Sequence, residues 1–144
     1  MDMGIKGKTA LICGSSKGLG RGCAEALAAE GVNLVMNART SSILERTAEK
    51  IRKTYKVEVK TIACDVTTVD GQNKVFDTIS NLDILVTNAG GPPPGMWHDW
   101  EQEDFLAALN ANMLTPIAMG IMTAIVASHG AEAVAAFGVG SRIE

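Results

Sequence analysis

One short stretch of the chain combines residue types and a spacing that suit the binding of phosphate groups. Gly14, Gly18 and Gly20 lie in the sequence Cys-Gly-Ser-Ser-Lys-Gly-Leu-Gly, after an apolar run and before a segment of helical character. Glycines let the chain turn tightly and bring bare backbone close to a ligand. The free N–H groups and the positive dipole end of the following helix then face a pyrophosphate. We interpret the stretch as a dinucleotide site, with a purely structural turn as the alternative.

The end of the second apolar run indicates which dinucleotide would bind. Sites for NAD carry an acidic residue about 20 positions after the glycines, where it binds the ribose 2′-hydroxyl. This chain has Asn37, Ala38 and Arg39 there, with no Asp or Glu. Arg39 could pair with a 2′-phosphate, and Lys17 adds a second positive charge. The sequence therefore favours NADP over NAD, and the alternative is that Arg39 is a solvated surface arginine.

A second pattern with chemical consequences joins Asn112 to Pro116. Proline has no N–H, so Pro116 cannot donate a hydrogen bond to the carbonyl group of Asn112, four residues earlier. That carbonyl is released from the helical ladder and is free to hold another donor. The alternative is an ordinary helical asparagine followed by a proline kink.

Apolar runs alternate with helical patterns over the first 90 residues and predict the elements that position these motifs. We expect strands at 7–14, 32–36, 57–63 and 84–86, and helices at 18–30, 42–55 and 69–80. Such alternation predicts an α/β fold, a Rossmann-type doubly wound parallel sheet with strand order 3-2-1-4. A fifth strand at 133–139 could extend it. Ser42 and Glu45 have capping-box spacing, and Gly71 is expected to weaken the third helix.

Length and composition favour one globular domain and exclude several classes of protein. The 144 residues are 47% hydrophobic, and they carry a net charge of −3, whereas a protein that binds nucleic acid usually carries a positive surface. The three cysteines are scattered and suit a reducing cytosol, and no apolar stretch follows the N-terminal charges. We therefore expect a cytoplasmic protein. His98 and His129 have no cysteine or carboxylate cluster beside them, so no metal site is expected.

With these motifs in place, residues 5–116 resemble the N-terminal part of a short-chain dehydrogenase/reductase, similar to the 3-oxoacyl-[acyl-carrier-protein] reductase-like members. The resemblance implies an NADP(H)-dependent oxidoreductase that transfers a hydride to or from a small carbonyl compound. It implies that Asp65 and Val66 contact the adenine ring and that Asn112 is the family's catalytic asparagine. The cofactor-binding residues that it implies are Gly14, Ser16, Lys17, Gly18, Leu19, Gly20, Arg39, Asp65, Val66, Asn88, Ala89 and Gly90.

The same resemblance draws attention to a missing acid/base pair. The family uses a tyrosine, with a lysine four residues later whose charge lowers the tyrosine pKa. The single tyrosine here is Tyr55, followed at that distance by Val59, and no lysine follows Lys74. We expect a cofactor-binding but catalytically incompetent chain, which would act on a carbonyl substrate only if completed. A pure dinucleotide-binding module and a non-functional fusion product are the alternatives.

The last part of the chain departs from the family pattern. Residues 117–144, chiefly Gly-Ala-Glu-Ala-Val-Ala-Ala-Phe-Gly-Val-Gly-Ser-Arg-Ile-Glu, resemble a fragment of a MATE-type multidrug transporter. We therefore predict two parts: an NADP-binding part, 1–116, and a divergent or fused segment, 117–144. The apolar run from 113 to 126 is shorter than the roughly 18 residues a membrane span needs, so the chain as a whole is not expected in a membrane. The alternative is a fourth helix plus an edge strand of the same domain, and a homo-oligomer remains open.

Overall fold

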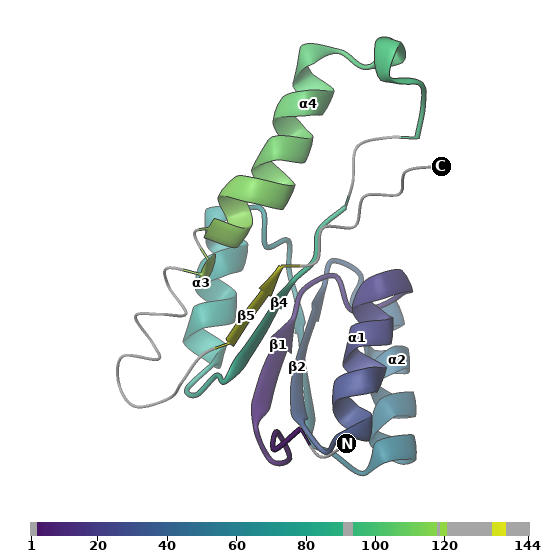
Figure 1. Ribbon diagram of the computed structural model, residues 1–144, viewed down its shortest axis with the longest axis vertical. Coiled ribbons are helices and arrows are strands. Elements are labelled where there is room, and N and C mark those ends of the chain that lie inside the picture. The colour runs from purple at the N-terminus through teal and green to yellow at the C-terminus, as the bar shows by residue number, and fades with distance from the viewer. Residues whose placement is uncertain (1–2, 91–93, 118, 121–133, 138–144) are drawn as a thin grey trace.

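A computed structural model of the chain describes residues 3–90, 94–117, 119–120 and 134–137 (Figure 1). Its strands are β1 (Thr9–Ile12), β2 (Asn33–Ala38), β3 (Val59–Ala63), β4 (Ile84–Thr87) and β5 (Val134–Phe137). Its helices are α1 (Gly18–Ala29), α2 (Ser41–Tyr55), α3 (Val69–Thr78) and α4 (Gln102–Leu109), with a short 3₁₀ turn at Trp97–Asp99 and a π-helical turn at Asn110–Leu114. All strand pairs are parallel, in the order β3-β2-β1-β4-β5. The predicted α/β fold and strand order are confirmed.

Helices cover both faces of the sheet, which explains why its strands are apolar almost throughout (Figure 1). Alternate residues of one strand point to opposite faces. Ala10 and Ile12 pack beneath α1 and α2, in a core that includes Leu44 and Ile51. Leu11 packs on the other face, in a second core that includes the α3 residue Val75. Two apolar layers therefore fix the sheet on which the strand ends are displayed.

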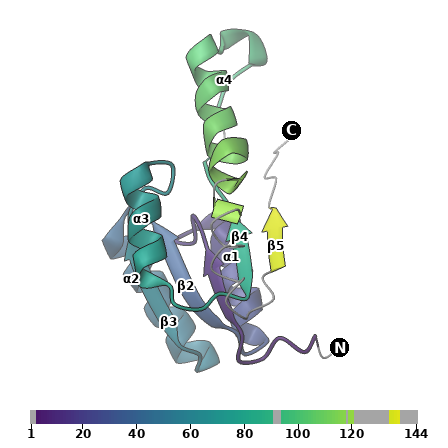
Figure 2. The same cartoon turned by 90° about the vertical axis from the view of Figure 1, so that its left-hand side faces the viewer.

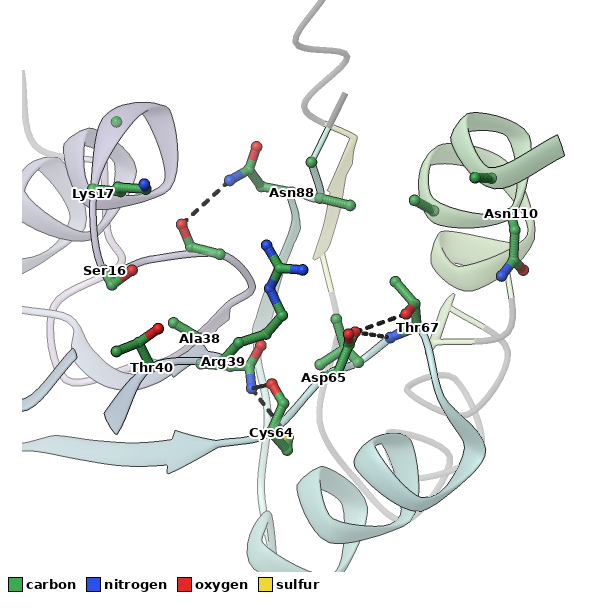
Figure 3. A pocket seen from close by; sticks show the side chains of 18 of the residues that line it. Ser16, Lys17, Ala38, Arg39, Thr40, Cys64, Asp65, Thr67, Asn88 and Asn110 are labelled. Atoms are coloured by element: carbon green, nitrogen blue, oxygen red, sulfur yellow. Dashed lines mark hydrogen bonds between the residues drawn. The ribbon is translucent and has the colours of Figure 1, made fainter. Parts of the chain in front are cut away.

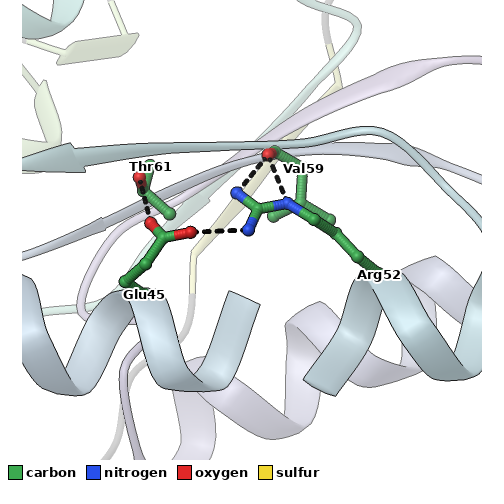
Figure 4. Close-up of polar contacts among 4 residues, drawn as sticks. All are labelled: Glu45, Arg52, Val59 and Thr61. Carbon is green, nitrogen blue, oxygen red and sulfur yellow. Dashed lines mark hydrogen bonds and ion pairs between the residues drawn. The ribbon is translucent and has the colours of Figure 1, made fainter. Parts of the chain in front are cut away.

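The expected capping box at Ser42 and Glu45 is wrong. Helix α2 starts at Ser41, and its N-cap residue makes no side-chain cap hydrogen bond. The Glu45 carboxylate instead accepts hydrogen bonds from Arg52 Nη1 at 2.6 Å and Thr61 Oγ1 at 2.8 Å (Figure 4). Arg52 also donates from Nε and Nη2 to the Val59 carbonyl, at 3.0 and 2.7 Å. Since β3 is an edge strand of the described sheet, α2 satisfies an edge carbonyl that no neighbouring strand reaches.

Gly71, expected to be a weak point of α3, has a specific packing role in its first turn. A Cβ atom at this position would collide with the carbonyl oxygen of Asp65 and lie 3.0 Å from Thr68 Oγ1. Thr68 is the N-cap residue, and its hydroxyl accepts a hydrogen bond from the Gly71 N–H at 3.1 Å. The missing side chain thus lets α3 start directly against the turn that follows β3.

The predicted division at residue 116 falls where α4 continues toward the sheet. Most of the transporter-like stretch lies outside the described residues; Ile117, Met119, Gly120 and β5 are described. Met119 is buried, with its sulfur 3.8 Å from the sulfur of Cys13, and β5 pairs with β4. The two-part organisation therefore stays a prediction. Within the described ranges, no helix has the length and apolar character needed to cross a membrane.

Candidate dinucleotide-binding site

A cavity of about 690 Å³ lies at the carboxyl ends of the central strands, where open parallel sheets bind ligands (Figure 3). Segments that follow β1, β2, β3 and β4 line it, and α4 with its π turn provides a further wall. The structure brings together all of the predicted cofactor residues except Leu19 and Gly20. Those at the cavity are Gly14, Ser16, Lys17, Gly18, Arg39, Asp65, Val66, Asn88, Ala89 and Gly90.

The glycine-rich loop owes its shape to glycines at three positions. Gly14 and Gly18 have φ angles of 60° and 59°, a region that side chains rarely adopt. Gly20 is buried; a Cβ atom there would collide with the carbonyl group of Gly14 and lie 2.9 Å from Asn88 Nδ2. Gly20 therefore acts by letting α1 approach the loop, while Leu19 is 70% exposed and lies outside the cavity lining.

Hydrogen bonds from three other parts of the chain hold this loop in place. Ser15 donates from its N–H and its Oγ to the Asn37 carbonyl, at 2.9 and 3.1 Å. Thr47 of α2 donates from Oγ1 to the Ser16 carbonyl at 3.0 Å, and Asn88 Nδ2 lies 3.4 Å from the Gly14 carbonyl. The N-cap position of α1, Lys17, makes no side-chain cap hydrogen bond, so the N–H groups of the first turn remain available to a ligand.

Charges of both signs reach the cavity. Lys17 and Arg39 are exposed side chains in its lining, and Arg39 extends into it from the end of β2 (Figure 3). Asp65 Oδ1 accepts hydrogen bonds from the backbone N–H of Thr67 at 3.0 Å and from the Thr67 hydroxyl group at 2.7 Å. These bonds, and more weakly the charge of Arg39, hold the pKa of Asp65 below its usual range. The cavity lining therefore combines two cations, Lys17 and Arg39, with the carboxylates of Asp65 and of Asp104 in α4.

Asn37 has a structural role that was not predicted from the sequence, where it counted only as a non-acidic residue at the end of β2. Asn37 is 2% exposed and lines the cavity. Its Nδ2 donates to the carbonyl groups of Ile62 and Cys64, at 2.9 and 3.2 Å, and lies 3.1 Å from the Cys64 sulfur. A polar residue inside an apolar strand could have indicated this role, because a buried amide group needs hydrogen-bond partners.

The wall formed by α4 differs in character, since Ala107, Ala108 and Ala111 contribute small side chains to it. Asn112 lies beside this wall, in the π turn and exposed, and is not part of the cavity lining. Its Nδ2 donates to the carbonyl groups of Ala108 and Gly90, at 2.9 and 3.2 Å. The π turn ends just before Pro116, whose missing N–H disturbs the ladder upstream.

The sequence of this chain matches a known protein family. The family model described as short chain dehydrogenase matches residues 8–134. The chain belongs to the short chain dehydrogenase family. It is 34% identical over 94 residues to the 3-oxoacyl-[acyl-carrier-protein] reductase FabG of Aquifex aeolicus, covering 62% of this chain and 38% of that protein. It is 29% identical over 118 residues to the uncharacterized oxidoreductase YvaG of Bacillus subtilis, covering 81% of this chain and 45% of that one.

The fold also matches that of a reductase whose structure has been solved. The L-sorbose reductase of Gluconobacter frateurii, crystallised with NADPH and L-sorbose, superposes with a TM-score of 0.80 at 31% identity. The match covers 88% of this chain and 49% of the reductase. The chain thus spans about half the length of this reductase and less than half of the curated relatives above.

Tyr55, the single tyrosine of the chain, lies away from the cavity. It is the last residue of α2, which runs from the carboxyl end of β2 back to the start of β3. Its half-buried ring packs against the core beneath α1 and α2, and it does not line the cavity.

Among the described residues, no group of three or more His, Cys, Asp or Glu side chains could hold a metal ion.

Proposed function

We propose that this chain binds NADP(H) in the cavity at the carboxyl edge of the sheet, as the cofactor-binding part of a short-chain carbonyl/alcohol oxidoreductase. The observation that carries the proposal is the convergence, in one cavity, of the glycine-rich loop, the uncapped start of α1, and the cations Lys17 and Arg39. The NADPH in the crystal of the related sorbose reductase supports the same cofactor class.

Each part of the cofactor has a chemically suitable partner. The pyrophosphate would lie on the glycine-rich loop, where backbone N–H groups and the positive end of α1 stabilise anions. The 2′-phosphate would face Arg39, whose guanidinium group can bind two phosphate oxygens at once. The adenine would lie against Asp65 and Val66, because a carboxylate held as an anion can accept from its exocyclic amine.

Catalysis needs more than this chain contributes. When bound, the cofactor supplies the hydride, but the carbonyl oxygen also needs a proton donor. Tyr55 lies away from the cavity, and no lysine follows Lys74. Asn112, with its side chain tied to Gly90 and Ala108, is our candidate for the remaining part of the catalytic set. We therefore propose that these 144 residues bind NADP(H) without reducing a carbonyl compound, 3-oxoacyl substrates included.

Replacing Arg39 by alanine tests the cofactor assignment. A charge-assisted hydrogen bond contributes about 1.5–3 kcal/mol, so the Kd for NADPH should rise about 10- to 150-fold, while the Kd for NADH stays within about threefold. Titration calorimetry with both cofactors measures this. Arg46→Ala is the control, because Arg46 is also exposed near the start of α2 but does not line the cavity. Equal losses for NADH and NADPH with Arg39→Ala would refute the 2′-phosphate role.

A further inference from the structure

Asn37 connects two walls of the cavity that are far apart in the sequence. It is the fifth residue of β2, the strand that lies between β1 and β3. Its backbone carbonyl accepts both hydrogen bonds of Ser15, on the β1 side. Its side-chain amide donates to the carbonyl groups of Ile62 and Cys64, on the β3 side. One buried residue therefore ties together the ends of three neighbouring strands.

The contacts of Asn37 lie next to the groups that would hold the cofactor. Ser15 stands between Gly14 and Ser16, both of which line the cavity. Cys64 directly precedes Asp65 and lines the cavity itself. The Cys64 thiol also lies 3.4 Å from the carbonyl oxygen of Gly71, which extends the connection to the first turn of α3 (Figure 3 shows Cys64 and Asp65). The Asn37 side chain thus adds to the backbone pairing of β2 with β3 at the point where the Asp65 turn begins.

The chemistry of these contacts requires an amide at position 37. The side chain faces two carbonyl oxygens, so it must donate. An aspartate of the same shape would place a carboxylate against those oxygens. An alanine would leave them without a donor in a buried place. Neither change would alter the backbone carbonyl that holds Ser15, so the disturbance would fall on the β3 side of the cavity.

We propose that Asn37 is a positioning residue for the cofactor: its amide holds the Asp65–Val66 turn at a fixed separation from the glycine-rich loop. This inference rests on the proposed NADP(H) function. It predicts that Asn37→Ala weakens NADPH binding through the turn, although Asn37 itself need not contact the adenine. The effect should appear equally with 2′,5′-ADP, which contains the adenosine end of NADPH without the nicotinamide.

The test is a double-mutant cycle between Asn37 and Asp65. The Kd values are measured at a temperature well below the melting midpoint of every variant. We expect Asn37→Ala to raise the Kd for NADPH and for 2′,5′-ADP about tenfold or more in the wild-type background. In the Asp65→Ala background the same change should raise the Kd less than about twofold, because the effects of substitutions at two residues that act together are not additive. Asn37→Ser, which keeps a small polar side chain, is measured in parallel in case the alanine variant does not fold.

Ile51→Val is the matched stability control, because Ile51 is 1% exposed in the core beneath α2 and does not line the cavity. It should lower the melting midpoint and leave both Kd values unchanged. If the Asn37 variants behave in the same way, or if their losses add to that of Asp65→Ala, the positioning role is wrong. If the wild-type chain binds neither ligand, the proposed function fails first and this inference fails with it.

Discussion

The two sides of the cavity are built differently. The side formed by the ends of β1, β2 and β3 is tied by buried hydrogen bonds, with Asn37 and Thr47 both nearly inaccessible to solvent. On the other side, none of the residues Gln102–Leu109 of α4 is buried. In both views α4 extends beyond the carboxyl edge of the sheet (Figures 1 and 2).

The chain's own contacts therefore stabilise one wall of the cavity much more than the other. The apolar side chains of α4 and its continuation are about half exposed; they are Phe105, Leu106, Leu109, Met113, Leu114 and Ile117. A helix with little buried apolar area opens at a lower free energy than the core. The wall proposed for the adenosine end of NADP(H) should therefore be rigid, while the α4 wall should be the less stable part of the site.

The same leucine truncation made on the two sides gives the largest expected contrast. Leu44 of α2 is fully buried, whereas Leu106 of α4 is 53% exposed. Leu44→Ala should lower the free energy of unfolding by about 2–5 kcal/mol, and Leu106→Ala should change it by less than about 0.5 kcal/mol. Urea denaturation measures both. A comparable loss for Leu106→Ala would mean that the α4 face is covered in solution, and the contrast would disappear.

A pair of glycine variants in α1 tests the rigid wall itself. Gly20→Ala places a methyl group against the Gly14 carbonyl, so it should cost about 1–3 kcal/mol of stability and abolish detectable NADPH binding. Gly22→Ala meets no atom within 4 Å and should stabilise α1 by about 0.5–1 kcal/mol. Thermal melting and NADPH titration report both effects. Unchanged NADPH affinity in Gly20→Ala would show that the close approach of α1 to the loop is not needed.

The smallest effect concerns the edge of the sheet beside the rigid wall. Hydrogen bonds from Arg52 and then Thr61 lower the pKa of Glu45 below its ordinary value of 4.5. Because the folded-state pKa is the lower one, the stabilisation is present above pH 4.5 and is lost as the pH falls through the folded-state value. Glu45→Gln should therefore cost less than about 1 kcal/mol at pH 7, and less still in acid.

Melting curves of the wild type and of Glu45→Gln from pH 7 to pH 3 measure this dependence. Glu49→Gln is the control on the same helix, because the Glu49 side chain is exposed and its carboxylate has no hydrogen bond or ion pair among the described residues. A difference between wild type and Glu45→Gln that stays constant over the range would contradict the assignment of the low pKa to this contact.

Periodicity predicted the sheet and its order, because buried parallel strands and their covering helices leave strong local patterns. The sequence also indicated most of the residues that the cavity gathers, since glycines and charges at strand ends are visible locally. It could not reveal the contacts of Asn37 or Glu45, because their partners lie on other strands. It also gave no sign that Gly71 lies against the carbonyl group of Asp65, because that contact is formed only when α3 packs on the turn after β3. The π turn before Pro116 likewise depends on a ladder seen only in three dimensions.

The most direct test of the central claim is thermal melting of the 144-residue chain alone, with NADPH and with NADH. A ligand that binds only the folded state at 100 times its Kd adds about 2.7 kcal/mol to stability. We predict a clear rise of the melting midpoint with NADPH and a smaller rise with NADH at the same concentration. No rise with either cofactor would contradict a dinucleotide site, and a larger rise with NADH would contradict the role given to Arg39.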